Sequence, residues 1–228
     1  MKNIPVITID GTTGSGKGSV GAGLADKLGW HFLDSGAIYR ILALAALKQG
    51  LSAHDHQALY DLARNLNVEF KCTLGQPQQV IYLGDDITSA IRQEKCGIFA
   101  SQIAAIPTVR EALLECQRSF KKAPGLIADG RDMGTVVFKE AVLKVFLGAD
   151  AHERALRRQK QLQKYGVSGS LHEILQDLIE RDKRDEKRAI APLKPADNAV
   201  VIDTTKISID EVMQQILEQA KIRGISIQ

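Results

Sequence analysis

Apolar residues follow two spacings along this chain, and the two alternate. Short apolar runs of strand length, rich in β-branched residues, recur between longer segments in which apolar residues lie three or four positions apart. The first spacing predicts buried strands, and the second predicts amphipathic helices. Strands alternating with helices predict an α/β fold with a mostly parallel sheet flanked by helices. Strands are predicted at residues 4–9, 30–33, 125–129, 142–147 and 199–203.

The predicted helices lie between these strands, and several have recognisable ends. The helix of residues 19–28 ends at Gly29, and the next begins near Gly36. Ser52 to Asp55 resemble a capping box, which predicts that a third helix begins there. Further helices are predicted from about Ser101, after Pro107, and at 151–164, 170–188 and 209–220.

One segment interrupts the alternation of strands and helices. Residues 68–71 and 79–83 are apolar or alternating at strand length, and Leu74 to Pro77 between them are turn residues. These patterns predict a small antiparallel insertion over residues 67–87.

Composition narrows the class of protein. The chain has 228 residues, 44% hydrophobic and 25% charged, which is typical of one globular domain with elaborations and excludes disordered and low-complexity classes. No apolar run approaches the roughly 20 residues of a membrane span, and the N-terminus lacks a long apolar region before a cleavage site. We therefore expect a cytoplasmic protein without a membrane partner.

Charge and cysteine content indicate neither a nucleic-acid partner nor a metal centre. The net charge of +3 is too small to indicate nucleic acid by itself. Cys72, Cys96 and Cys116 are odd in number and far apart, which favours reduced thiols over a disulfide or a metal site.

A phosphate-binding loop follows the first predicted strand. Gly11, Gly16 and Lys17 satisfy the pattern GxxxxGK, in which backbone N–H groups and a helix N-terminus converge on phosphate oxygens. Glycine allows close approach and positive φ, and Lys17 supplies a positive charge. The alternative is a glycine-rich turn with an exposed lysine. The predicted ATP-binding residues are Gly11, Thr12, Thr13, Gly14, Ser15, Gly16, Lys17, Gly18 and Ser19.

The end of this loop departs from its common form. Ser or Thr usually follows the lysine, but here Gly18 stands at that position and Ser19 comes next. The GxGKG[ST] ending resembles nucleoside monophosphate kinases and argues against a GTPase.

Two further stretches carry candidate ligand-binding residues. Ser35 precedes a helix and Arg40 lies on its first turns, although their positions alone favour an N-cap serine and an ordinary surface arginine. The strand of residues 125–129 ends in Asp129, which would place a carboxylate near magnesium. Arg131 and Asp132 follow it where ligands bind in open α/β sheets, and a plain turn is the alternative.

The segment from Asp150 to Arg188 is strongly charged, with alternating signs. Most of these charges are expected to form surface pairs that contribute little individually. Two helices carrying several arginines nevertheless predict a lid that closes over a polyphosphate. The arginines are Arg154, Arg157, Arg158, Arg181, Arg184 and Arg188.

Four blocks together resemble the bacterial cytidylate kinase family over essentially the whole chain, including the insertion. Members transfer the γ-phosphoryl group of ATP to CMP or dCMP. Thr12 stands where the family usually has Pro, and Ser19 where it has Thr, but Ser19 keeps the hydroxyl and we expect activity to be retained. The blocks are GTTGSGKGS at 11–19, LDSGAIYR at 33–40, ADGRDMGTVVF at 128–138 and RDKRDEKRAIAPL at 181–193.

The resemblance implies a role for each matching residue. It implies that Lys17, Arg131, Arg157 and Arg158 are catalytic, and that Mg²⁺ arrives with ATP and has no direct protein ligand, with Asp129 acting through water. The residues implied to read the cytosine are Ser35, Arg110, Asp132 and Arg188. Those implied to hold the pentose are Ser101, Arg181 and Asp185, and those implied to bind the CMP phosphate are Arg40 and Arg131.

The same resemblance implies a functional division of the chain. The expected division is a core at 1–35, 107–150 and 190–228, a nucleoside monophosphate region at 36–106 and a lid at 151–189. We expect a monomer, because no long apolar repeat suggests an interface.

Other functions are less consistent with the sequence. A related kinase acting on UMP, dTMP or shikimate is the main alternative. A GTP-binding switch is disfavoured because no [NT]KxD guanine-binding motif is present. The most similar stretch, Thr205 to Ser208, lacks the aspartate. A nucleic-acid-dependent ATPase is disfavoured by the weak net charge.

Overall fold

The computed structural model describes residues 4–71, 79–164 and 169–225. The chain divides into two compact units. We call residues 34–119 the inserted unit, and residues 1–33 together with 120–228 the core unit. Cys72 and the predicted turn at 74–77 lie outside the described residues. Cys96 and Cys116 are free thiols, as predicted.

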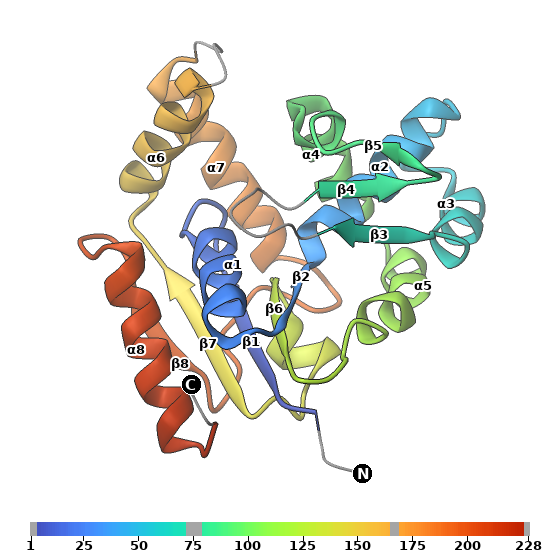
Figure 1. The fold of residues 1–228 in the computed structure, drawn as a ribbon. Helices are drawn as coiled ribbons and strands as arrows, with labels where there is room; N and C mark the ends of the chain where they lie inside the picture. Colours follow the sequence, from blue (N-terminus) through green and yellow to red (C-terminus); the bar gives the residue numbers. More distant parts are fainter. Residues whose placement is uncertain (1–3, 72–78, 165–168, 226–228) are drawn as a thin grey trace. The chain divides into compact units, whose positions relative to one another are not determined.

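The core unit contains a five-stranded sheet with β1 at its centre (Figure 1). β1 runs parallel to β6 and to β7, with Ile9 opposite Asp129 and Val145, and β7 runs parallel to β8. The prediction of a mostly parallel α/β sheet is therefore confirmed. The strand order is β2 (His31–Asp34), β6 (Leu126–Gly130), β1 (Val6–Gly11), β7 (Leu143–Gly148) and β8 (Val200–Asp203).

Helices α1 (Lys17–Leu28) and α8 (Ile209–Ile222) cover one face of this sheet and lie side by side. Ile7 and Ile9 of β1 face these helices and are fully buried, in one cluster with Leu24 and Ile216. Strand alternation therefore turns the residues between them toward the opposite face. The short π-helix η2 (Met133–Val137) follows β6 and packs against β1.

After β7 the core unit continues into two paired helices, α6 (Ala151–Lys164) and α7 (Leu171–Glu186). Ala155, Ile174 and Leu178 form a small apolar cluster between them. The predicted helices at 151–164 and 170–188 are confirmed to within two residues. No helix in the described part of the chain is both long and apolar enough to span a membrane.

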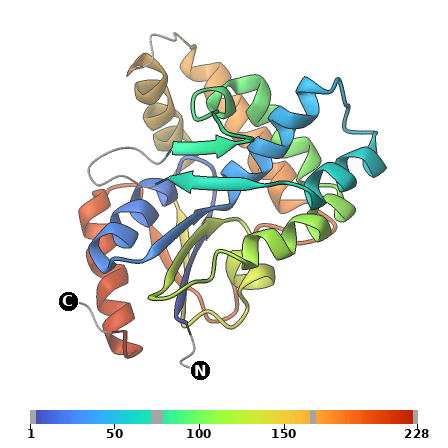
Figure 2. The same ribbon diagram turned by 45° about the vertical axis from the view of Figure 1, so that its right-hand side comes forward.

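The inserted unit combines helices with a separate antiparallel sheet, whose strands β3 and β4 point in opposite directions in Figure 2. The predicted antiparallel insertion is confirmed, and a two-residue strand, β5, extends it. The elements are α2 (Ser35–Lys48), α3 (His56–Arg64), β3 (Val68–Lys71), β4 (Gln79–Tyr82), β5 (Asp85–Asp86), η1 (Ala90–Arg92), α4 (Glu94–Ile103) and α5 (Pro107–Arg118).

Two predicted helix starts in this unit are wrong. The helix expected from about Ser101 begins at Glu94 and includes Gly97, whose lack of a side chain leaves room for the Arg40 guanidinium. The helix expected at Ser52 begins at His56. The Asp55 carboxylate accepts instead from Ser52 N and Ser52 Oγ, each at 2.7 Å, and closes a turn ahead of the helix.

Gly11 lies directly against the neighbouring strand of the central sheet. A Cβ atom at this position would lie 2.0 Å from Leu147 O of β7, and the residue has a φ of +151°. Any other residue would force β1 and β7 apart or twist the chain before the phosphate loop.

We expect Gly11→Ala to lower the free energy of unfolding by about 3 kcal/mol or more, since the added methyl group overlaps backbone that cannot move alone. Gly29→Ala is the matched control, because Gly29 also has a positive φ, +63°, but nothing within 4 Å of the added atom. Its cost should be about 1 kcal/mol. Urea unfolding of both variants measures the difference, and equal costs would contradict the steric account.

Candidate active site

The predicted phosphate loop joins β1 to α1 and folds around one carbonyl oxygen. Thr12 O accepts from Ser15 Oγ at 3.0 Å and from Lys17 Nζ at 2.7 Å. Gly14 and Gly16 have φ values of +81° and +93°, which glycine adopts without strain. The loop is therefore shaped by local hydrogen bonds and by glycine.

The N-terminus of α1 opens onto this loop. Gly16 is its N-cap residue, and no side chain accepts a hydrogen bond there. The first N–H groups of a helix have no partner within it and carry the positive end of the helix dipole. This combination suits a phosphate group.

Lys17 is almost completely buried, with 6% of its surface exposed. Burial is the main reason that its pKa falls to about 7, and the nearby charge of Arg131 lowers it further. Asp129 and Asp10 act in the opposite direction. A phosphate group bound beside Lys17 would therefore favour the protonated, charged form of its amine.

Arg131 joins three segments of the core unit. Its guanidinium donates to Thr13 Oγ1 of the loop at 2.7 Å, to Gly130 O at 3.1 Å and to Asp185 Oδ2 of α7 at 2.9 Å. Burial acts to raise the pKa of Asp185, but Arg131, Arg188 and Arg181 outweigh it and hold that pKa below its usual range. Arg188 also pairs with Asp185.

Arginines of α6 contact the loop and its surroundings. Arg154 is buried, donates to Thr13 O at 3.0 Å and pairs with Asp182 at 2.6 Å. Removing one partner of such a buried pair typically costs about 3–5 kcal/mol. Arg154 therefore holds α6 and α7 against the loop.

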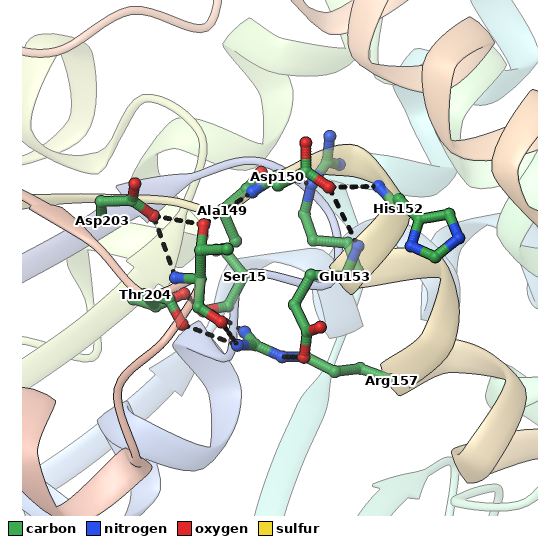
Figure 3. Close-up of polar contacts among 10 residues, drawn as sticks. Ser15, Ala149, Asp150, His152, Glu153, Arg157, Asp203 and Thr204 are labelled. Atoms are coloured by element: carbon green, nitrogen blue, oxygen red, sulfur yellow. Dashed lines mark hydrogen bonds and ion pairs between the residues drawn. The ribbon is translucent and has the colours of Figure 1, made fainter.

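Arg157 and Arg158 differ in their contacts. Figure 3 shows Arg157 pointing to Thr204, whose carbonyl accepts from Arg157 Nη2 at 2.6 Å. Thr204 Oγ1 accepts from Arg157 Nη1 at 3.2 Å and donates to Ser15 O at 3.0 Å. Arg158 donates to Gln161 of its own helix at 2.7 Å. Arg157 is thus linked to the phosphate loop through Thr204.

Asp129 lies at the end of β6 beside the start of α1. Its Oδ2 would be 3.5 Å from a Cβ atom at Gly18, and its charge acts on Lys17 and Arg131. Among the described residues, no group of three His, Cys, Asp or Glu side chains could hold a metal ion. A single carboxylate fits Mg²⁺, which usually keeps several waters and few protein ligands.

In the inserted unit, Ser35 and Arg110 are buried within hydrogen-bonded clusters. Ser35 Oγ donates to Gln117 Oε1 of α5 at 2.8 Å, while Asp34 is the N-cap of α2, so the N-cap alternative for Ser35 is wrong. Arg110 donates to Ala104 O at 3.0 Å, and its guanidinium lies 5.8 Å from the centre of the Tyr39 ring.

Arg40 and Ser101 lie on the packed helices α2 and α4 of the same unit. Arg40 Nη1 donates to Ile91 O at 2.8 Å, and a Cβ atom at Gly97 would lie 2.8 Å from Arg40 Nη2. Ser101 is buried on α4. The four predicted residues of this unit therefore come from α2, α4 and α5.

Sequence reasoning missed two residues of the core unit. Asp10 is a buried carboxylate on the apolar strand β1, and its Oδ atoms accept from Met133 N and Gly134 N. A charged residue on an otherwise apolar strand was a signal for it. Thr204 links Arg157 to Ser15, and nothing local in the sequence indicates that contact.

A family model and curated relatives indicate the same family. The family model described as cytidylate kinase matches residues 7–222. The cytidylate kinase of Stutzerimonas stutzeri is 53% identical over 99% of both chains. The cytidylate kinase of Aeromonas hydrophila subsp. hydrophila is 55% identical over 95% of this chain and 94% of that one.

Similarity to solved structures is weaker. A shikimate kinase from Acinetobacter baumannii is 18% identical, with a TM-score of 0.45 over 99% of this chain and 97% of that one. Similarity at this level carries no argument about the substrate.

The lowered pKa of Lys17 predicts proton uptake when a polyphosphate binds. At pH 8 the Lys17 amine is mostly neutral, because its pKa is about 7. Phosphate oxygens favour the charged form and raise that pKa, so binding of ATP should take up about one proton and weaken as pH rises above 7. Calorimetry in HEPES and in Tris at pH 8 measures the uptake.

Lys17→Met should abolish most of this difference between buffers. If the wild-type protein shows the same binding enthalpy in both buffers, the lowered pKa of Lys17 is wrong.

Proposed function

Because this chain belongs to the cytidylate kinase family, we propose that it transfers the γ-phosphoryl group of ATP to CMP or dCMP. The observation that carries the proposal is the family match over residues 7–222. It is supported by a phosphate loop in which Lys17, Arg131 and Asp129 interact. The products are ADP and CDP or dCDP.

In this proposal ATP binds at the loop of residues 11–19. The N–H groups of the α1 N-terminus and of the loop donate to the phosphate oxygens, and the positive charge of Lys17 offsets part of the phosphate charge. The uncapped start of α1 supports this assignment. Thr12 leaves the backbone donors of the loop in place, and Ser19 offers a hydroxyl on the first turn of α1.

The proposed CMP-binding residues follow the chemistry of the nucleotide. A carboxylate can accept from the exocyclic amine of cytosine, and arginine can donate to its O2 and N3 atoms. The planar fork of arginine suits the phosphate. The residues are Ser35, Arg110, Asp132 and Arg188 for the base, Ser101, Arg181 and Asp185 for the pentose, and Arg40 and Arg131 for the phosphate.

Catalysis in this proposal is positioning and electrostatic stabilisation. Phosphoryl transfer spreads negative charge over several oxygens and needs no covalent nucleophile from the protein. Lys17, Arg131, Arg157 and Arg158 supply positive charge. Mg²⁺ bound with ATP would neutralise further phosphate charge, with Asp129 contacting it through water.

The proposed division of labour assigns residues 36–106 to CMP binding and residues 151–189 to a lid. A closed lid excludes water, which would otherwise accept the phosphoryl group. The proposal includes a monomer in the cytoplasm with small-molecule partners and no nucleic-acid partner.

Acceptor specificity tests the proposed function. Initial rates with ATP should be highest with CMP or dCMP and lower with UMP, dTMP or shikimate.

Lys17→Ala should reduce kcat about 100-fold or more, because a single electrostatic stabiliser of a transition state is worth that much. Circular dichroism checks that the variant is folded. A higher rate with another acceptor would overturn the assignment of CMP as the substrate. A near-normal rate for Lys17→Ala would overturn the catalytic role of Lys17.

Asp132→Ala tests the base-binding role separately. We expect the KM for CMP to rise about tenfold to 100-fold, and the KM for ATP to change less than about threefold, because only the cytosine amine loses its acceptor. Asp197→Ala, at an exposed aspartate of the core unit, is the matched control. An equal loss for both nucleotides would remove Asp132 from the base site.

A further inference from the structure

Asp10 occupies an unfavourable position for a carboxylate. It lies on β1 with 4% of its surface exposed, on the face opposite Ile7 and Ile9. Burial raises its pKa to about 7 even though two N–H groups donate to it, and the nearby charge of Asp132 adds to the rise while Lys17 opposes it. An apolar residue would cost less here. The carboxylate therefore calls for an explanation beyond packing.

The two hydrogen bonds of Asp10 hold one end of η2. Asp10 Oδ1 accepts from Met133 N and Oδ2 from Gly134 N, each at 2.8 Å. These N–H groups begin the helix and have no partner within it. Asp132 is the N-cap residue, but its side chain does not accept the capping hydrogen bond. The start of η2 is thus capped by the side chain of Asp10 on β1 and not by that of Asp132.

Gly134 allows this contact. A Cβ atom there would lie 2.9 Å from Thr8 Oγ1 and 3.3 Å from Asp10 Oδ2. The η2 backbone thus lies directly on the Thr8 and Asp10 side chains. Arg131 is held from the other side, through Thr13 and Asp185. The segment 130–134 is consequently fixed at both ends.

We propose that Asp10 is a positioning residue. It fixes the backbone segment that presents Arg131 and Asp132 to the acceptor nucleotide. The proposal rests on the proposed function, because that assigns both residues to CMP. Asp10 also precedes Gly11, the first residue of the phosphate loop, so a general structural defect at this position would disturb ATP binding first. Positioning of the acceptor segment would instead affect CMP selectively.

Asp10→Asn tests the proposal with almost no change in size. The asparagine amide has one accepting oxygen and one donating NH₂ group, so its NH₂ group would face one of the two N–H donors of η2. One of the two hydrogen bonds is therefore lost. We expect the KM for CMP to rise about tenfold or more, and clearly more than the KM for ATP, on which only the loss of one negative charge near Lys17 acts. Equal changes in both KM values, or an unchanged KM for CMP, would overturn it.

Thr8→Val is the matched control. Thr8 shares the strand and the face of Asp10, is fully buried, and its Oγ1 has no hydrogen-bond partner among the described residues. This variant should keep both KM values within about twofold of wild type, since no hydrogen bond is removed. A tenfold rise in the KM for CMP here would show that any change on this face has the same effect, and would overturn the specific role of Asp10.

Two further measurements keep the proposal testable if Asp10→Asn folds poorly or the proposed function fails. Gly134→Ala presses on the same contact without altering the carboxylate, and it should produce the same selective rise in the KM for CMP. Hydrogen exchange needs no substrate: the Met133 and Gly134 amides should exchange about tenfold faster in Asp10→Asn than in Thr8→Val.

If the wild-type protein does not phosphorylate CMP, the proposed function fails. The hydrogen-exchange result then decides whether Asp10 holds this segment. Unchanged exchange of both amides in a folded Asp10→Asn variant would overturn the positioning role independently of any activity.

Discussion

The Lys17 ammonium group is almost fully buried, and a buried cation requires dipoles and charges arranged around it. Thr12 O supplies the nearest dipole at 2.7 Å, and Asp10 and Asp129 supply negative charge. The two carboxylates come from β1 and β6, neighbouring parallel strands whose carboxyl ends lie at the same edge of the sheet. The strand order therefore sets the electrostatic environment of the phosphate loop as well as the core.

Arginines connect this charged centre to the segments after β7. Arg131 reaches α7, Arg154 joins the loop to Asp182, and Arg157 reaches Thr204. Each guanidinium donates to more than one segment, which its planar fork allows and a lysine ammonium group allows less well. Residues proposed to bind or stabilise phosphates thus also hold the core unit together. Ligand binding and local stability are physically coupled for this reason.

The sequence predicted most elements because each depends on contacts within a few residues. Its errors in helix starts occur where a side chain makes a contact that the apolar spacing does not show. The helix predicted from about Ser101 begins at Glu94, and its Gly97 leaves room for the guanidinium of Arg40, which is distant in the sequence. Asp55 caps a turn instead of a helix, because its carboxylate bonds back to Ser52.

The α/β order, the antiparallel insertion and the phosphate loop could be predicted without the structure, because strand and helix periodicity and the GxxxxGK spacing are local properties. In contrast, long-range packing sets which groups surround Lys17, places Asp10 at the start of η2, and joins Arg157 to Ser15 through Thr204. Asp10 and Gly134 are 124 positions apart in the chain, and Ser15 and Thr204 are 189 apart. Pairing and packing of parallel strands bring them together, and no local spacing encodes that proximity.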